Sequence, residues 1–441
     1  MAKKDPRLKK LADEVKESLA GEDFSKYSEV MLSLLGDGFA VLSDSRQQSK
    51  VKHLLRDCIA IVLFCVFSDI DEWIEMEMFA EDNLDTLKKY LELPNGVPSH
   101  DTLERVMSVI KPEELQDMLV DVLRETITRA CGGDGYLYEN PKLELYIKDV
   151  VAVDGKETRN SGDPYSKDPA AGRNFNVLNV QSTETGITLS ATRIDEKTNE
   201  IPEAQSVLKK LDLRGCVVTA DAMNTQKETA RVIVEEAHAD YCLALKSNHP
   251  LFCSEMTDFF HDPDILRTME ETDGQFLEET ESNSAKKTSW QYYITDDISW
   301  FAERNQWKKL KSFGYVKKTT VNKKTGETSM EERYYLLSVP PVADLFSLVV
   351  GRHWHIENLL HWVLDVVFKE DSLRTREKKA LNNLGLVKRF VLSVLKILKP
   401  YYNNISFRYI RRKIGRNLEK EIPVIFAVLK KMYDMGAAFD L

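Results

Sequence analysis

The chain has 441 residues, of which 43% are hydrophobic and 30% are charged, a balance that is ordinary for a folded protein of two or three domains. Its longest purely apolar run, residues 58–67, is about half of the ~20 residues that a membrane-spanning helix needs. No hydrophobic segment follows the charged start of the chain. We therefore expect a cytoplasmic protein without a membrane partner, rather than a disordered, membrane-spanning or exported one.

The formal net charge of −10 at pH 7 is unevenly distributed along the chain. Residues 372–420 contain 14 Lys and Arg against two acids, which gives this segment +12 and leaves −22 for the rest. Concentrated positive charge favours a surface that binds a polyanion, and a solvated helix face is the alternative. The basic residues on which the first interpretation depends are Arg374, Arg376, Arg408, Arg411, Arg412, Lys413 and Arg416.

Residues 1–130 are predicted to form a helical N-terminal domain. Helical patterns cover 54–67, 71–79, 84–93 and the residues from 101 onward. A Pro-Asn-Gly turn precedes Asp101, and Glu104 follows three residues later, which is a helix-start signal. This arrangement fits a helix-turn-helix, but no basic cluster marks a recognition helix, so a plain packing domain is the alternative. The glycine-rich residues 131–135 are the predicted domain boundary.

Residues 136–260 are predicted to alternate strands and helices. One apolar run is expected to end as a buried strand at Asp154, and a second, residues 216–220, leads into Asp221. The other predicted elements are strands at 175–181, 187–194 and 241–245 and helices at 201–211 and 225–239. In such a sheet the two acids would lie on adjacent central strands.

A third acid, Glu357, follows a predicted strand-rich insertion at residues 261–344. It lies in residues 345–400, where a long helix is expected to begin at Leu345, and basic C-terminal helices at 401–441 complete the chain. Three carboxylates from two strand ends and one helix would suit two Mg²⁺ ions, which prefer oxygen ligands. With 71 acids in the chain, this pattern alone is a weak signal.

Several motifs, in this order, resemble the H-repeat-associated (ISAs-type) insertion-sequence transposases. The motifs are Pro94-Asn-Gly-Val-Pro-Ser-His-Asp-Thr102, Val151-Ala-Val-Asp-Gly-Lys156, Thr219-Ala-Asp-Ala-Met-Asn-Thr-Gln-Lys227, Ala244-Leu-Lys-Ser-Asn248, His353-Trp-His-Ile-Glu-Asn358 and Leu360-His-Trp-Val-Leu-Asp365. These proteins belong to the DDE transposases, whose catalytic domain is RNase H-like. The resemblance implies an α/β chain: an RNase H-like mixed sheet with a strand-rich insertion, an all-α domain before it and C-terminal helices after it. It also implies that the all-α domain, residues 1–130, reads the DNA ends of the element.

The resemblance also implies a function. Asp154, Asp221 and Glu357 would hold two Mg²⁺ ions, with Mn²⁺ as a substitute, for cleavage at the ends of a bacterial insertion sequence and strand transfer into target DNA. The implied partners are double-stranded DNA, as terminal inverted repeats and as target, and further copies of the chain in a homo-oligomeric synaptic complex. A nucleoid-associated location would follow.

Candidate phosphate contacts lie beside the three acids, and each lysine among them could equally be a surface residue. They are Lys156, Lys227, Lys246, Arg352 and His353. The wider group places Tyr, Arg and Lys around the glutamate at positions that hold Val350, His353 and Leu364 here, so Arg352 and His353 would substitute only in part.

These residues also allow other interpretations. The acids that compete with Glu357 for the metal are Asp365, Glu370 and Asp371. A zinc hydrolase using His353, Glu357 and His361 is one rival function, although no His-Glu-x-x-His motif is present. A metal-dependent nuclease and a catalytically inactive, transposase-derived DNA-binding protein are the others.

Overall fold

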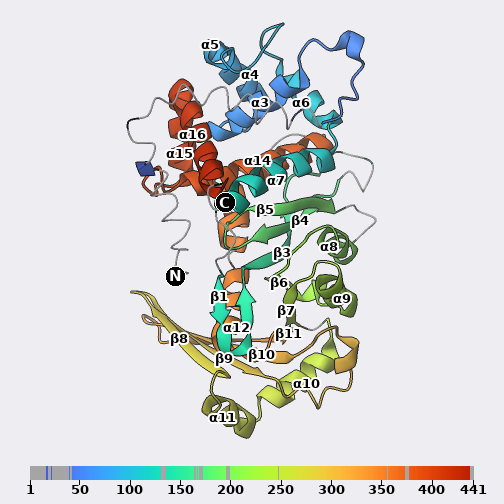
Figure 1. Ribbon diagram of the computed structural model, residues 1–441, viewed down its shortest axis with the longest axis vertical. Coiled ribbons are helices and arrows are strands. Elements are labelled where there is room, and N and C mark those ends of the chain that lie inside the picture. Colours follow the sequence, from blue (N-terminus) through green and yellow to red (C-terminus); the bar gives the residue numbers. More distant parts are fainter. Residues whose placement is uncertain are drawn as a thin grey trace.

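The computed structural model shows a nine-stranded mixed sheet flanked by helices (Figure 1). The described residues are 42–130, 136–162, 172–194, 199–246, 248–354, 356–372 and 377–437, with the single positions 16, 17, 21, 39, 165 and 167. The strand order is β5-β4-β3-β6-β7-β11-β10-β9-β8. The strands of residues 136–260 and of the predicted insertion therefore belong to one sheet.

Five strands form the RNase H-like half of the sheet, which confirms the predicted fold class. Three of them, β3 (Asp149–Thr158), β6 (Cys216–Ala220) and β7 (Asp240–Leu245), run parallel in the centre. The antiparallel hairpin of β4 (Phe175–Ser182) and β5 (Thr188–Ile194) extends the sheet from β3. The β-branched runs in β3 and β6 are buried, as expected for strands covered on both faces.

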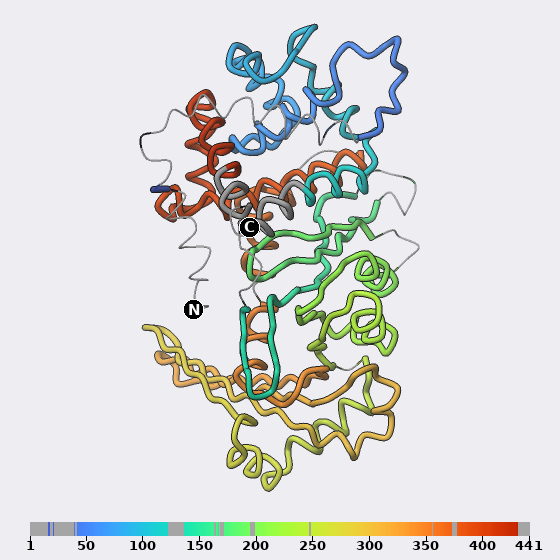
Figure 2. The backbone as a smooth tube through the Cα atoms, viewed as in Figure 1, coloured from blue at the N-terminus to red at the C-terminus, as the bar shows by residue number. Residues whose placement is uncertain are grey.

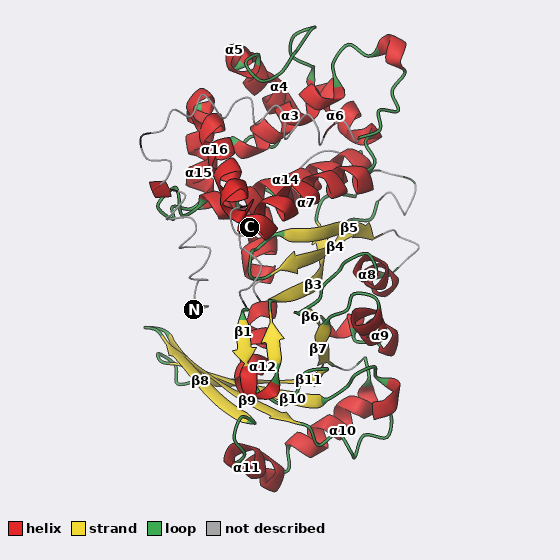
Figure 3. Ribbon diagram, viewed as in Figure 1, coloured by secondary structure: helices red, strands yellow, loops and turns green. Residues whose placement is uncertain are grey.

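The predicted insertion is strand-rich and continues the same sheet. Its strands are β8 (Phe276–Ser282), β9 (Lys286–Thr295), β10 (Ser312–Asn322) and β11 (Thr328–Leu337). β11 pairs antiparallel with β7, so the insertion is joined directly to the parallel strands. Figure 3 shows these strands as a curved extension at one end of the sheet, beside α10 (Pro250–Phe260) and α11 (Pro263–Glu271).

Successive side chains of each strand point to opposite faces of the sheet, and helices cover both faces. Val151 and Val153 of β3 share a core with the helices α8 (Glu200–Leu208) and α9 (Lys227–Glu235). Val150, which points to the opposite face, joins the core with α12 (Ala343–His353). Asp154, which follows Val153, is thereby held at a fixed position between two layers of helices.

The helices from the two ends of the chain pack together into one core (Figure 2). Their bounds are α3 (Leu55–Phe67), α4 (Trp73–Asp82), α5 (Leu84–Leu87), α6 (His100–Val109), α7 (Pro112–Ala130), α14 (Lys378–Leu398), α15 (Phe407–Arg416) and α16 (Leu418–Ala437). α7 lies against α14 and α16. Residues 131–135, the predicted domain boundary, lie outside the described part of the chain. None of the described helices is long and apolar enough to cross a membrane.

Several predicted element boundaries were wrong. β3 runs past Asp154 to Thr158, because residues 154–158 pair with β4, and Leu145–Ile147 forms a separate strand, β2, that pairs with β1 (Tyr138–Asn140). The residue before α6 is Ser99, and Asp101 lies exposed in the first turn of that helix.

The long helix predicted from Leu345 is also interrupted. α12 is followed by the π-helical turn Glu357–His361 and then by α13 (Trp362–Val366). Single π turns widen a helix and shift its register, and they occur often at functional sites.

Candidate active site

Asp154 and Asp221 lie at the same level of two neighbouring parallel strands. Val153 of β3 pairs with Ala220 of β6, and each is followed directly by one of the acids. The side chain of Asp154 is 13% exposed, whereas that of Asp221 is 49% exposed. The predicted placement of these acids on adjacent central strands is therefore confirmed, with one carboxylate buried and the other open to solvent.

Glu357 and a further acid, Glu200, contribute negative charge to the same place. Burial raises the pKa of Asp154 to about 8. The carboxylates of Asp221, Glu200 and Glu357 add to this rise of the Asp154 pKa by repulsion. Glu357 itself is exposed on the π-helical turn. The structure thus places Asp221 and Glu357 near enough to Asp154 for their charges to repel its ionised form.

Two histidines, each four residues from Glu357, approach the two aspartates. The Nδ1 atom of His353 lies 3.0 Å from Thr219 Oγ1, and its Nε2 atom lies 3.6 Å from Asp221 Oδ1. The Nδ1 atom of His361 lies 3.4 Å from Asp154 Oδ2. Contact with His353 lowers the pKa of Asp221, whereas burial lowers the pKa of His361 to about 3 and keeps that ring neutral.

The donor set fits a hard divalent cation. Carboxylate oxygens are the preferred ligands of Mg²⁺, and the carboxylates of Asp221, Glu200 and Glu357 are near enough to Asp154 to raise its pKa in addition to the effect of burial. Across the described residues, no three His, Cys, Asp or Glu side chains are already drawn together around one point. The two histidines point to different aspartates, so their geometry lends no support to a shared zinc ion.

Glu200 was missed by the sequence analysis. It begins α8, and its carboxylate lies so close to Gly155 that a Cβ atom at position 155 would overlap it. The side chain of Asn224 donates a hydrogen bond of 2.6 Å to Glu200 Oε1. The only local signal was the glycine after Asp154, which allows this close approach.

The three acids that compete with Glu357 surround Lys156 instead. The Nζ atom of Lys156 lies 2.7 Å from Asp365, 3.1 Å from Glu370 and 3.3 Å from Asp371. Arg389 adds a second ion pair to Glu370, at 2.6 Å. Burial opposes the ionisation of Glu370, but Arg389 and Lys156 outweigh it and hold the pKa of this carboxyl to about 2. These acids already have cations, and Lys156 is buried rather than available to a phosphate.

The other phosphate contacts predicted beside the acids differ in their surroundings. Lys246 is exposed near Asp221, whose pKa it helps to lower. Lys227 is held 2.7 Å from Glu303, and Arg352 lies 3.2 Å from Glu184. Lys246 therefore remains the most accessible of these cations at the site. Arg333 of β11, which the sequence analysis did not select, also lowers the Asp221 pKa.

The basic C-terminal residues fall into three groups. Arg374 and Arg376 lie outside the described residues. Arg411 is fully buried and donates hydrogen bonds to Asp69 and Asp71, because it faces the core together with Ile410 and Ile414 of α15. This burial contradicts the prediction that Arg411 contacts DNA. The remaining predicted residues, Arg408, Arg412, Lys413 and Arg416, are exposed on α15.

Comparisons with known proteins identify the family of this chain. Residues 146–391 match the family described as Transposase DDE domain, and residues 37–122 match the one described as DDE_Tnp_1-associated. The H repeat-associated putative transposase YhhI of Escherichia coli (strain K12) is 28% identical over 389 residues, which are 88% of this chain and 96% of the relative. The putative transposase YncI of Escherichia coli O157:H7 is 29% identical over 385 residues, 86% of this chain and 91% of the relative.

A solved structure, described as the piggyBac transposase synaptic complex with hairpin DNA, has a TM-score of 0.37 and 12% identity over 91% of this chain and 77% of that chain. The fold assignment rests on the strand order and not on this weak likeness. The matched DDE domain spans more than half of the chain and contains Asp154, Asp221 and Glu357. This protein therefore belongs to the transposase family that the DDE domain defines.

Proposed function

We propose that this protein is an active DNA transposase of a bacterial insertion sequence, with Asp154, Asp221 and Glu357 as the metal-binding acids. The observation that supports this proposal most directly is the placement of Asp154 and Asp221 side by side at the ends of two parallel strands. Burial and, to a smaller extent, the nearby acids Asp221, Glu200 and Glu357 raise the pKa of Asp154 there. A family whose domain is named for three such acids makes DNA cleavage and strand transfer the reaction that fits this site.

Each part of the chain has a separate task in this reaction. Two bound Mg²⁺ ions would activate the attacking oxygen and stabilise the leaving oxygen of an in-line displacement. The sheet fixes Asp154 and Asp221, and the π-helical turn carries Glu357. His353 keeps Asp221 ionised, and Lys246 is placed to contact a DNA phosphate. Water attacks first and frees a 3′-hydroxyl, which then attacks target DNA in the same site.

The exposed basic face of α15 is proposed to contact the DNA backbone. Its members are Arg408, Arg412, Lys413 and Arg416. Phosphate contacts of this kind position DNA without reading its sequence. The roles of α6 in reading element ends and of a homo-oligomer in synapsis stay predictions.

The test compares three isosteric variants, Asp154→Asn, Asp221→Asn and Glu357→Gln, with the exposed control Asp212→Asn. The substrate is a duplex that carries the inverted repeats flanking the gene, with Mg²⁺ or Mn²⁺. Loss of ~4 kcal/mol of charge stabilisation corresponds to roughly a 10³-fold slower cleavage in each site variant, with DNA binding retained. The control should cleave at the wild-type rate.

Other outcomes would contradict the proposal in distinct ways. DNA binding by the wild-type protein without cleavage in any divalent metal would identify an inactive, transposase-derived binding protein. Cleavage without strand transfer would identify a nuclease, and activity only with zinc would favour the zinc alternative. Near-full activity of Glu357→Gln would move the third ligand to Asp365 or Glu370.

A further inference from the structure

A chain of largely buried polar side chains reaches Asp154 from the face of the sheet against which α14 packs. It consists of Arg389 on α14, Asn179 on β4 and His361 at the end of the π-helical turn. None of the three has a part in the reaction described above. Polar groups are costly to bury, so a connected set of them beside a catalytic acid calls for a functional explanation.

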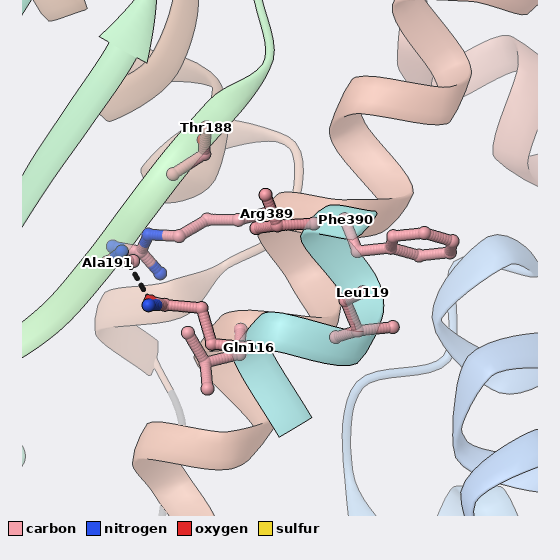
Figure 4. Close-up of a pocket in the computed structure, with 8 residues that line it drawn as sticks. Gln116, Leu119, Thr188, Ala191, Arg389 and Phe390 are labelled. Atoms are coloured by element: carbon pink, nitrogen blue, oxygen red, sulfur yellow. Dashed lines mark hydrogen bonds between the residues drawn. The ribbon is translucent and has the colours of Figure 1, made fainter. Parts of the chain in front are cut away.

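Asn179 lies directly opposite Asp154 in the antiparallel pairing of β4 with β3. Residues paired in this way project to the same face of the sheet. Asn179 is completely buried, and its Oδ1 atom accepts a hydrogen bond of 2.7 Å from Arg389 Nε. Figure 4 shows the Arg389 side chain extending from its helix toward the sheet.

This contact fixes the orientation of the Asn179 amide. A guanidinium group only donates hydrogen bonds, so the amide oxygen must face Arg389 and the Nδ2 atom must face away from it. Nδ2 donates to the carbonyl oxygen of Val177 at 3.0 Å and lies 3.4 Å from His361 Nε2.

The same geometry fixes the tautomer of His361. An amide nitrogen has protons but no free lone pair, so His361 Nε2 must be the acceptor in this contact. A neutral imidazole with an unprotonated Nε2 carries its proton on Nδ1. That atom lies 3.4 Å from Asp154 Oδ2. The proton of His361 is therefore directed at one oxygen of the buried aspartate.

Arg389, the member of this set of side chains that is farthest from Asp154, is held by an ion pair and a hydrogen bond. The Nη1 atom of Arg389 lies 2.6 Å from Glu370 Oε1 and donates to the carbonyl oxygen of Gly385 at 3.0 Å. The other carboxylate oxygen of Glu370 lies 3.1 Å from Lys156, which is two residues beyond Asp154 on the same strand. The position of the arginine is thus set by the strand that carries the aspartate.

We propose that Arg389 and Asn179 hold His361 as the Nδ1-protonated tautomer, so that His361 binds Oδ2 of Asp154 and Oδ1 would be the oxygen that holds a metal ion. His361, Asn179 and Arg389 are then positioning residues, and the inference rests on the proposed function of Asp154 as a metal ligand. Groups that orient a metal ligand in this way typically change metal affinity by about 10–100-fold when they are removed.

The first experiment measures Mn²⁺ binding to the full-length protein by calorimetry, without DNA. Glutamine at position 361 places its amide near Nε2 and removes the donor to Asp154, whereas asparagine places its amide near Nδ1. We expect His361→Gln to bind Mn²⁺ about 10–100-fold more weakly. His361→Asn should restore binding close to the wild-type value.

Two results would overturn the inference. One is wild-type Mn²⁺ affinity in His361→Gln, even with a lower melting temperature, because that pattern means a structural role only. The other is equal loss of affinity in the Gln and Asn variants. Asp154→Asn separates the two proposals: wild-type affinity in this variant would remove Asp154 as a ligand, and lost affinity there with normal affinity in His361→Gln would reject the positioning role alone.

The second experiment observes the tautomer itself. Long-range ¹H–¹⁵N spectra of protein labelled in its 8 histidines, assigned with His361→Gln, should show Nδ1 of His361 protonated. In Asn179→Asp a carboxylate faces Nε2 in place of the amide, so the proton should move to Nε2 or both nitrogens should be protonated. An Nε2-protonated ring in the wild-type protein would overturn the inference.

Discussion

Asp154 and Glu370 are both largely buried carboxylates on the same side of the sheet, yet their pKa values are shifted in opposite directions. Asp154 faces other acids, and burial together with their repulsion raises its pKa to about 8. Glu370 lies between Lys156 and Arg389, which hold its pKa to about 2 despite burial. The protein supplies cations for Glu370, whereas under the proposed function a metal ion would bind Asp154.

This contrast distinguishes a structural acid from a candidate metal ligand where sequence position does not. Glu357 and Glu370 lie on one segment, 13 residues apart, and either could have been the third acid of the site. A buried carboxylate with two ion pairs stabilises the packing of helices on the sheet, and removing one partner of such a pair is costly. Four experiments would break or sharpen the distinction.

The largest effect on stability is expected for Glu370→Gln. This change leaves Lys156 and Arg389 without their shared carboxylate, and loss of one partner of a buried ion pair typically costs about 3–5 kcal/mol. Urea unfolding measures the difference. Glu357→Gln is the matched control, since Glu357 is exposed and its replacement should change stability little. Equal losses in the two variants would contradict the comparison.

The next effect is stabilisation by Mg²⁺. A ligand at 100 times its dissociation constant stabilises a protein by about 2.7 kcal/mol. Because the pKa of Asp154 is about 8, metal must displace a proton at lower pH. The rise in melting temperature at fixed Mg²⁺ should therefore grow from pH 6 to pH 8 and then level off. It should be absent in Asp154→Asn, and a shift independent of pH in the wild-type protein would be inconsistent with this site.

A smaller effect of opposite sign is expected for Asp154→Asn without metal. The folded-state pKa of Asp154 lies above that of the unfolded chain, so the contribution of this residue to stability is greatest below pH ~4 and falls as the pH rises toward 8. Asparagine avoids this ionisation and should stabilise the metal-free protein at pH 8–9 by roughly 1–3 kcal/mol, the usual cost of an uncompensated buried polar group. Chemical unfolding at pH 5 and pH 8.5 measures it, and a destabilised variant at pH 8.5 would refute it.

The smallest effect on stability is expected on the exposed face of α15, where the same contrast recurs between Arg411 and its neighbours. Replacing Arg408, Arg412 and Arg416 by Ala should leave the fold intact and flatten the slope of log K for DNA against log salt by up to ~2.7, at ~0.9 per phosphate contact. Arg411→Ala should instead destabilise the protein, because its ion pairs with Asp69 and Asp71 are internal. An unchanged slope in the triple variant would mean that these residues form a solvated helix face that does not contact DNA.

The sequence by itself determined the local features of this protein. Alternating and β-branched residues predicted the strands that lead to Asp154 and Asp221, and the glycine and helix signals between them predicted the order of elements. These features depend on neighbours within a few residues, so they can be read from a single chain. The motifs around the three acids likewise predicted the family, and the long stretch before Glu357 predicted the insertion.

Only the tertiary structure decided which charged residues are paired and which are open. Lys156 meets Asp371 across 215 residues, Arg389 meets Asn179 across 210, and Arg411 meets Asp71 across 340. Periodicity placed Arg411 on a basic helix face but could not show that this position turns toward the core. The energy of a charge depends on its burial and on the charges beside it, and both are set by contacts between distant segments. For that reason the identity of the acids could be predicted, whereas their electrostatic roles could not.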